Sequence, residues 1–396
     1  MILFELSHTS HTLAATGIQQ VCRNLFAEAG KIAPGAALVR DPWQKSWRIA
    51  SRGENARALP SEGGGIARRK GEAWRFSEKV RGRLKWFAGI RGPLPKDAEA
   101  VIFPEFTMQR CLDALPELRA ALPDNVPVVA VFHDAIALRM PEISAKATVE
   151  RFPRYIEALA RFDAVAAVSE TSRAELAALW YHRGIVSVPP LVSIPLGVAI
   201  PRLEAAPVPR RPGASIRVLC ISTLEPRKNH AALLDAAESL WREGLGFHLE
   251  LVGMEHRQLG GPIVAKIRAM QGAGLPLEWH GTVDEATLHA LYAGCDFTIY
   301  PSLMEGFGLP VLESLAHKKP CVTSPCGALE EVARGGGCLI LEGTSAHEVA
   351  DGLRAMLREE GLLEHLSAEA SARPIRSWAD YARDIVAFAR STTRRW

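Results

Sequence analysis

The chain has 396 residues, of which 48% are hydrophobic and 23% are charged, and its formal net charge is +3. This length favours two domains with sizeable cores, and so small a net charge gives no indication of nucleic-acid binding. The seven cysteines are scattered and include no Cys-x-x-Cys pair, which argues against a zinc knuckle and favours a reducing cytoplasm over a secreted disulfide scaffold.

Neither a signal peptide nor a membrane-spanning segment is expected. The first residues, MILFELSHTS, have no basic region and no long apolar run, both of which a secretory signal requires. No window approaches 18 uninterrupted apolar residues, the length at which a spanning helix would be considered. We therefore expect a cytoplasmic protein, a location that leaves contact with a membrane surface open.

Short apolar runs typical of buried strands alternate with helical stretches along the chain. Because the runs are apolar nearly throughout, they predict parallel sheets covered by helices on both faces. In the first half the expected strands are VPVVAVF (126–132), AVAAVS (164–169) and VSVPPLVSIPLGV (186–198). In the second half they are IRVLCIS (216–222), HLELVG (248–253), LEWHGTV (277–283), FTIYPS (297–302), CVTSP (321–325) and CLILE (338–342).

The region around residues 199–214 separates two such series. It is rich in Pro, Ala and Arg and shows no periodicity, which predicts an interdomain linker. We expect α/β, doubly wound, Rossmann-like domains over residues 1–198 and 215–375, and a C-terminal helix within 376–396. Ligands of these sheets bind beyond the carboxyl ends of the strands, so we expect the two domains to face a shared cleft.

The segment from Glu305 to Glu313, with the sequence EGFGLPVLE, directly follows an expected strand. Gly306 and Gly308 permit a tight turn and close approach to a ligand, and Pro310 suits the first position of a helix. The N-terminus of that helix offers backbone N–H groups to an anion. We expect Glu313 to lie in the first turn of this helix, and both glutamates to converge beside the phosphate site. A capped helix with exposed glutamates is the alternative.

Two cations, Arg227 and Lys228, follow the strand expected over 216–222 and precede a helix. Asn229 is the expected N-cap of that helix. A pair of cations beside a helix N-terminus would offset the charge of a diphosphate and stabilise the charge that grows when a nucleotide leaves. A solvated basic turn is the alternative.

These motifs resemble those of family 4 of the retaining nucleotide-sugar glycosyltransferases, which have two Rossmann-like domains in the GT-B architecture. The resemblance runs over most of the chain and is strongest from about 215 to 360. The Glu305–Glu313 segment is similar to the family's E-x7-E motif, and the Arg227–Lys228 pair to its diphosphate-binding pair. Trp378 and the residues after it resemble the C-terminal helix that crosses back to the first domain.

The resemblance implies a role for each motif. Glu313 is expected to bind the nucleotide ribose, Glu305 the transferred sugar, and the two cations the diphosphate. WHGTV (279–283) resembles the family's nucleobase-contacting strand end. The first domain matches more weakly: Gly17 opens an expected helix as the family's N-terminal glycine loop does, and His133 matches a histidine at a strand end beside the donor sugar. The residues assigned to catalysis are Glu305, His133, Arg227 and Lys228; those assigned to donor binding are Gly17, Gly281, Thr282, Val283, Phe307, Gly308, Leu309 and Glu313.

Several motifs of other enzyme classes are absent. The sequence contains no Asp-x-Asp, HExxH or His/Cys cluster, so we predict no metal site and no separate cofactor. It contains no GxxxxGK[ST] either, which disfavours a P-loop kinase. No GxGxxG follows the first strand, which disfavours a nicotinamide dehydrogenase.

Residues 66–92 hold nine basic and two acidic residues. Phe76, Val80, Leu84 and Phe87 fall near one face of a helix with this spacing. A basic amphipathic helix favours docking on anionic lipid, close to a lipid-linked acceptor. The alternative is a surface helix that packs its apolar stripe on the first domain.

We therefore predict a retaining, metal-independent glycosyltransferase. The stretch from His8 to Val21 resembles bacterial surface-polysaccharide members of the family, several of which use GDP-mannose. This resemblance implies mannosyl transfer to a glycan or lipid-linked acceptor. UDP-glucose or another donor, a sugar-nucleotide epimerase and a non-catalytic sugar-nucleotide-binding protein remain alternatives. A nucleic-acid module is disfavoured because the positive charge is confined to one segment.

Overall fold

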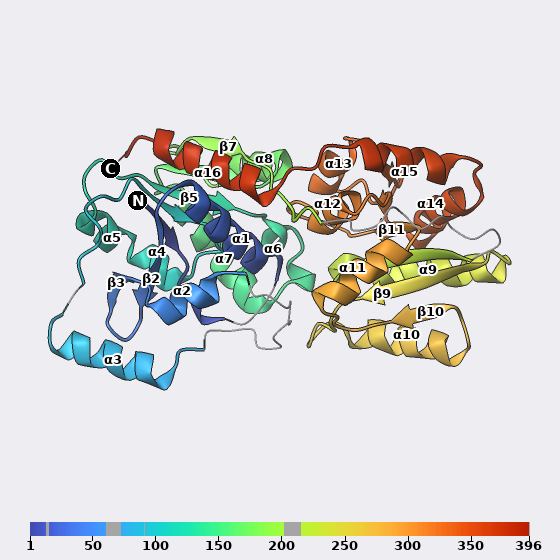
Figure 1. Ribbon diagram of the computed structural model, residues 1–396, viewed down its shortest axis with the longest axis horizontal. Helices are drawn as coiled ribbons and strands as arrows, with labels where there is room; N and C mark the ends of the chain where they lie inside the picture. The colour runs from blue at the N-terminus through green and yellow to red at the C-terminus, as the bar shows by residue number, and fades with distance from the viewer. Residues whose placement is uncertain (13–15, 61–72, 91, 202–214, 396) are drawn as a thin grey trace. The chain divides into compact units, whose positions relative to one another are not determined.

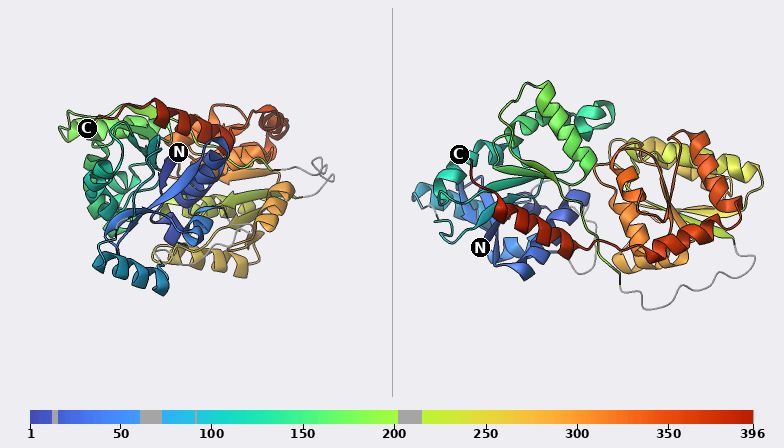
Figure 2. Two further views of the ribbon diagram at one scale, coloured as in Figure 1. Left: turned by 60° about the vertical axis from the view of Figure 1, so that its left-hand side comes forward. Right: turned by 90° about the horizontal axis from the view of Figure 1, so that it is seen from above.

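The computed structural model describes residues 1–12, 16–60, 73–90, 92–201 and 215–395 (Figure 1). Two units are formed: Met1–Gly197 together with Trp378–Trp396, and Val198–Ser377. Each is built on its own largely parallel sheet, with helices on both sides of the sheet (Figure 2). This is the predicted α/β class. Most of the expected linker, residues 202–214, lies outside the described residues.

The first unit contains a seven-stranded sheet in the order β3-β2-β1-β4-β5-β6-β7. All neighbouring strands are parallel except β2 and β3. The strands are β1 (Ile2–Glu5), β2 (Gly35–Asp41), β3 (Ser46–Ile49), β4 (Ala100–Phe103), β5 (Val128–Phe132), β6 (Ala164–Ala167) and β7 (Leu191–Ser193). Strands β5, β6 and β7 were predicted from the sequence, whereas the first four were not, because they are short or mix charged with apolar residues.

Every residue of β1, β4, β5 and β6 is buried, as expected for parallel strands covered on both faces. The covering elements of the first unit are α1 (Gly17–Ile32), α2 (Arg52–Ala58), α3 (Phe76–Phe87), α4 (Gln109–Asp113), α5 (Leu115–Ala121), α6 (Ile136–Arg139), α7 (Lys146–Leu159), α8 (Glu170–His182) and α16 (Trp378–Ser391), with 3-10 turns η1 (Thr9–His11) and η2 (Pro141–Ile143).

The last helix, α16, packs against α1 and β4 of the first unit. Tyr381, Ile385 and Ala389 follow one another at four-residue spacing and are fully buried, which is the stripe that a core-facing helix presents. Residues from both ends of the described chain therefore complete the core of the first unit.

The second unit contains a six-stranded parallel sheet in the order β10-β9-β8-β11-β12-β13. Its strands are β8 (Ile216–Ile221), β9 (Phe247–Val252), β10 (Leu277–Trp279), β11 (Phe297–Tyr300), β12 (Cys321–Thr323) and β13 (Cys338–Ile340). All six were predicted, although each ends earlier than expected. In β11 the reason is Pro301, which has no N–H group to donate to a neighbouring strand.

The helices of the second unit alternate with its strands. They are α9 (His230–Arg242), α10 (Gly261–Gly272), α11 (Glu285–Gly294), α12 (Leu309–Ala316), α13 (Ala328–Ala333), α14 (Ala346–Arg358) and α15 (Leu362–Ala372), with the 3-10 turn η3 (Pro226–Lys228). Strands β8 and β11 are hydrogen-bonded neighbours. Because they are parallel, the loops that follow them emerge at the same edge of the sheet.

No helix among the described residues is both long enough and apolar enough to cross a bilayer.

Candidate functional site

Arg227 and Lys228 lie in η3, the single 3-10 turn between β8 and α9. The turn ends at Asn229, which adopts a left-handed conformation with φ of 59°. Asn229 occupies the N-cap position of α9, but its side chain makes no capping hydrogen bond, so this part of the prediction is wrong. Its amide instead donates to the carbonyl oxygens of Pro301, at 3.2 Å, and Thr344, at 2.7 Å. Asn229 thus fixes the turn after β8 to the loop after β11.

Glu305 stands at the centre of the site, on the loop that follows β11. Its Oε1 accepts hydrogen bonds from Lys228 Nζ at 2.5 Å, Ser302 Oγ at 2.5 Å and Tyr300 OH at 2.9 Å. Its Oε2 lies 2.8 Å from Nη1 of Arg227. Only 11% of the Glu305 side chain is exposed. The structure therefore brings three of the predicted catalytic residues into one buried ion-pair cluster.

In this cluster, burial opposes the charge on each group, and the attraction between opposite charges favours it. Burial alone would raise the pKa of Glu305, but the attraction of Lys228 and Arg227 outweighs it and lowers that pKa to about 2. Burial likewise opposes the charge of Arg227, and Glu305 and Glu225 overcome it and raise the Arg227 pKa. For Lys228 burial dominates and lowers the pKa, although Glu305 opposes the shift.

This arrangement holds the two cations in place before any ligand arrives. Arg227 also donates to the carbonyl of Met304 at 3.0 Å and pairs with Glu225 at 2.9 Å. Donors fixed in advance stabilise developing negative charge without the cost of reorienting them. Both carboxylate oxygens of Glu305 already have protein partners. Its expected hydrogen bond to a transferred sugar therefore stays a prediction.

The turn into α12 depends on Gly308. This residue has φ of 108°, and a Cβ atom there would lie 2.7 Å from Cδ2 of Leu329, so only glycine fits without displacement. Phe307 before it is buried, and Leu309 begins the helix. The prediction for this helix needs two corrections: Pro310 is its second residue rather than its first, and Glu313 is its fifth, in the second turn rather than the first.

Glu313 has surroundings of its own. Tyr292 of α11, which is buried, lies beside the Glu313 carboxyl and lowers its pKa, but desolvation is stronger and raises that pKa to about 7. The ring of His317 stacks on Tyr292 at a centroid distance of 4.0 Å, and its Nδ1 lies 2.8 Å from the carbonyl oxygen of Glu313. Among the described residues, Glu305 and Glu313 are held by different partners, and their convergence on one ligand stays a prediction.

The predicted nucleobase-contacting residues lie just after β10. Gly281 has φ of 65°, and its carbonyl accepts a hydrogen bond from the backbone N–H of Gly253 at 2.8 Å. A Cβ atom on Gly253 would lie 1.8 Å from the carbonyl oxygen of Ser222. The loops after β8, β9 and β10 therefore pack backbone to backbone at the carboxyl edge of the sheet. Thr282 is exposed there and Val283 is half-buried.

Gly17 and His133 lie in the first unit. Gly17 is exposed and is the first residue of α1, as predicted for a glycine that opens a helix. His133 follows β5, and its Nε2 lies 2.8 Å from the carbonyl of Pro104, which follows β4. Burial lowers the pKa of His133. Because a carbonyl can only accept, Nε2 carries a proton, and in the neutral ring Nδ1 is an acceptor.

Two buried acids beside η1 were not predicted from the sequence. Glu5 ends β1 and Glu105 follows β4, and both are almost completely buried. Burial and the charge of Glu105 raise the pKa of Glu5 to about 7. Glu105 also accepts a hydrogen bond from the backbone N–H of Thr9 at 3.0 Å. The signal in the sequence is an acid at the end of an apolar run, as in ILFE.

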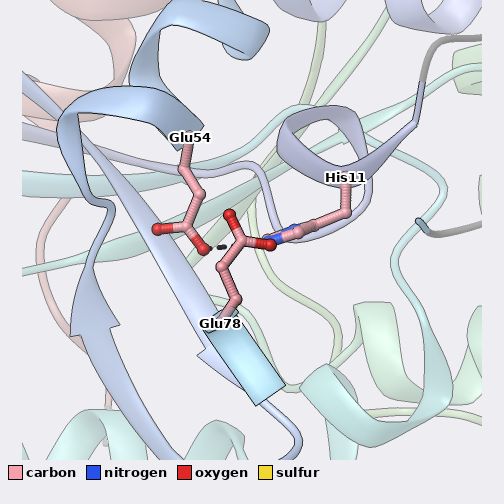
Figure 3. A group of neighbouring side chains, drawn as sticks. All are labelled: His11, Glu54 and Glu78. Carbon is pink, nitrogen blue, oxygen red and sulfur yellow. Dashed lines mark hydrogen bonds and ion pairs between the residues drawn. The ribbon is translucent and has the colours of Figure 1, made fainter. Parts of the chain in front are cut away.

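Three side chains of the first unit have the spacing of metal ligands. The liganding atoms of His11, Glu54 and Glu78 all lie within 4.8 Å of one another (Figure 3). Each already has a protein partner: His11 pairs with Glu54 at 2.9 Å, Glu54 with Arg48 at 2.7 Å, and Glu78 with Arg57 at 2.7 Å. The arginines supply the positive charge that a metal ion would bring, so we interpret the group as an internal ion-pair network.

The second unit is similar to a known family. Residues 202–373 match the family model described as Glycosyl transferases group 1, and this match lies almost entirely within the second unit. The chain is also 28% identical over 351 residues to the serotype-specific mannosyltransferase WbdA of Escherichia coli. The aligned region covers 84% of the chain but only 40% of WbdA.

A GDP-mannose-dependent alpha-(1-6)-phosphatidylinositol dimannoside mannosyltransferase of Mycobacterium tuberculosis is 26% identical, over 54% of the chain and 55% of that protein. The chain thus spans about half or less of the length of these relatives. Among solved structures, a sucrose-phosphate synthase from Thermosynechococcus elongatus has a TM-score of 0.66 at 17% identity and 98% coverage of both chains. Anabaena HepE in complex with UDP and glucose has a TM-score of 0.63 at 16% identity, with coverage of 98% and 99%. These similarities confirm the GT-B fold.

Replacing Glu305 by Gln tests the ion-pair cluster. Removing one charge of a buried cluster leaves its partners uncompensated, and we expect the free energy of unfolding at neutral pH to fall by about 3–5 kcal/mol. Because the pKa of Glu305 is lowered from 4.5 to about 2, its stabilisation is fully present above pH 4.5 and disappears as the pH falls through about 2. The difference between wild type and Glu305→Gln in urea unfolding should shrink over this window. Glu285→Gln, at an exposed position, is the control, and a difference that does not change with pH would contradict the assignment.

Glu313 should make donor affinity depend on pH. Its carboxyl group is neutral below its pKa of about 7 and charged above it, and hydroxyl groups donate more strongly to a charged carboxylate. The affinity for a nucleotide sugar, measured by calorimetry, should therefore rise by up to about tenfold from pH 6 to pH 8. The nearby His317 has its pKa lowered to about 4 by burial and does not titrate in this range. Glu313→Gln should abolish the slope and the exposed Glu364→Gln should keep it; a slope that survives in Glu313→Gln would refute the ribose contact.

Proposed function

We propose that the chain is a retaining, metal-independent glycosyltransferase that transfers a hexose from a nucleotide-sugar donor. The observation that carries the proposal is the cluster of Arg227 and Lys228 around Glu305. It lies at the carboxyl edge of the second sheet, beside the glycine turn into α12, where ligands of such sheets bind. The family match over this same unit supports the assignment.

The chemistry follows from the charges. In the transfer, the bond between the anomeric carbon and the donor diphosphate breaks, and the acceptor hydroxyl oxygen forms a bond to the same carbon. The diphosphate leaves with an added negative charge, which Arg227 and Lys228 would stabilise. The acceptor proton can pass to the leaving diphosphate oxygen, which balances the reaction. Glu305 is a poor candidate for a nucleophile because both of its oxygens are engaged with cations or hydroxyl groups.

We take mannose from GDP-mannose as the donor. The names of the relatives support this choice: WbdA and O-antigen chain mannosyltransferase B of Escherichia coli, and the GDP-mannose-dependent enzyme of Mycobacterium tuberculosis. The acceptor would be a glycan or a lipid-linked glycan of a bacterial surface polysaccharide. A lipid-linked acceptor would bring the chain to the cytoplasmic face of the plasma membrane as a peripheral protein. UDP-glucose is the second donor to test, because the structurally similar HepE was solved with UDP and glucose.

A thermal-shift panel in EDTA tests the donor. GDP, UDP, ADP and dTDP and their sugar conjugates are compared, since a ligand at a hundred times its dissociation constant adds about 2.7 kcal/mol to the stability of the native state. We expect guanosine nucleotides to give the largest shift. Product analysis then separates the classes of function: an epimerase converts the donor without an acceptor, and a binding protein shifts in stability but turns over nothing. Either result, or no shift with any nucleotide, would contradict the proposal.

Arg227→Ala and Lys228→Ala should each lower kcat by about 100-fold to 1000-fold, because the charge they stabilise is greatest in the transition state. The donor-transfer rate at saturating donor is the measurement. Arg242→Ala is the matched control, since Arg242 lies at the other end of α9 and its side chain is 72% exposed. Rates within threefold of wild type in both variants would refute the role of the cation pair.

A further inference from the structure

Helix α3 carries an unusual concentration of exposed apolar side chains. Twelve large hydrophobic residues are exposed among the described residues, and six of them lie between residues 76 and 90. The helix lies on the outside of the first unit (Figure 1). The six residues are Phe76, Val80, Leu84, Trp86, Phe87 and Ile90, with exposures from 39% for Val80 to 82% for Phe76.

The apolar stripe of α3 faces outward, because other residues of the helix form its buried side. Gly82 and Glu78 are the buried residues of α3, and a Cβ atom on Gly82 would lie 2.8 Å from Cβ of Trp43. At 100° per residue, Phe76 and Leu84 point away from that buried side. The alternative expectation, that the stripe packs on the first domain, is therefore wrong. Gly82 is there because the helix approaches the turn between β2 and β3 closely.

The same helix also carries several basic side chains beside its apolar residues. Lys79, Arg81, Arg83 and Lys85 lie along the helix, and its single acid, Glu78, is turned inward to an ion pair with Arg57. Arg81 and Arg83 are exposed, whereas Lys79 and Lys85 are half-buried, and Arg83 lies over the ring of Trp43 at 4.6 Å. Among the described residues these four cations have no acidic partner, so the surface of the helix combines apolar side chains with positive charge. A nucleic acid or an acidic protein would satisfy the cations but offers no apolar interior for Phe76 and Phe87. An anionic bilayer offers both.

The helix is also firmly attached at its start. Trp74, just before it, stacks on His11 with a centroid distance of 3.5 Å, and the backbone N–H of Ala73 donates to the carbonyl of His11 at 2.6 Å. Glu78 pairs with Arg57 of α2 at 2.7 Å, and its carboxylate lies beside His11 and Glu54 (Figure 3). A surface that is already ordered loses little conformational entropy when it binds, so α3 is suited to act as a fixed platform.

We propose that α3 docks the chain on an anionic lipid bilayer, with Phe76, Leu84 and Phe87 entering the apolar layer and the lysines and arginines contacting the headgroups. The choice of lipid as the partner rests on the proposed function, in which a lipid-linked acceptor is used. The docking itself does not require the transfer reaction, so the two can be tested separately.

Flotation of the full chain with vesicles tests the docking. We expect binding to vesicles of phosphatidylcholine with phosphatidylglycerol, little binding to phosphatidylcholine alone, and weaker binding as salt rises, because exposed charges are screened. Phe76→Ser with Phe87→Ser should weaken binding at least tenfold through lost apolar burial. The matched control is Tyr181→Ser with Val186→Ser, two exposed residues of the same unit outside α3.

The basic residues have their own variant and control. Arg81→Glu with Arg83→Glu should abolish flotation with the anionic vesicles, whereas Lys146→Glu with Arg154→Glu, exposed on α7, should not. Each variant is checked for an unchanged thermal transition and for unchanged transfer to a water-soluble acceptor. No flotation of wild type with anionic vesicles at low salt, or equal losses in the α3 and control variants, would overturn the proposal. If the wild-type chain floats with anionic vesicles but transfers no sugar, the result would count against the proposed function and not against the docking.

Discussion

The site in the second unit depends on one carboxylate placed between two cations. Arg227 and Lys228 are adjacent in the sequence, and their positive charges repel each other. Together with burial, the charge of Arg227 lowers the pKa of Lys228. Glu305 offsets this repulsion by pairing with both. A buried ion pair adds little net stability in general; here it fixes the positions of the two charges that the proposed reaction would use.

The sheet of the second unit brings these three residues together. Glu305 lies 77 residues after Lys228 in the sequence, and the two come together because β8 and β11 are neighbours in a parallel sheet. Asn229 strengthens the junction by donating from the first loop to the second. The left-handed turns at Asn229 and Gly308 then direct the chain into α9 and α12. The two loops, residues 222–229 and 301–308, are also hydrogen-bonded to each other, since Ser302 and Leu303 donate to the carbonyl of Arg227.

Much of this could be predicted from the sequence, but at different levels of detail. Buried parallel strands read as continuous apolar runs, which is why every strand of the second unit was identified. Strands β1 and β2 were missed because Glu5, Arg40 and Asp41 interrupt their apolar pattern. The partners of Glu305 could not be predicted fully either: Tyr300 and Ser302 lie within an expected strand, and sequence alone does not give the direction of a side chain at a strand end.

The amphipathic pattern of α3 shows a different limit. Periodicity predicted an apolar face correctly, yet it could not determine whether that face points inward or outward. The deciding contact is between Gly82 and Trp43, residues from two elements whose pairing has no signature in the local sequence. The same holds for the network of His11, Glu54 and Glu78, whose members come from three separate segments.

The position of α16 has a consequence for biosynthesis. This helix is translated after the entire second unit, yet Tyr381 and Ile385 complete the core of the first unit against α1 and β4. On the ribosome, the second unit is contiguous and can fold as soon as it emerges, whereas the first unit must wait with an apolar surface uncovered. Domains usually fold in the order of their synthesis; in this chain the unit that begins first is the one that finishes last.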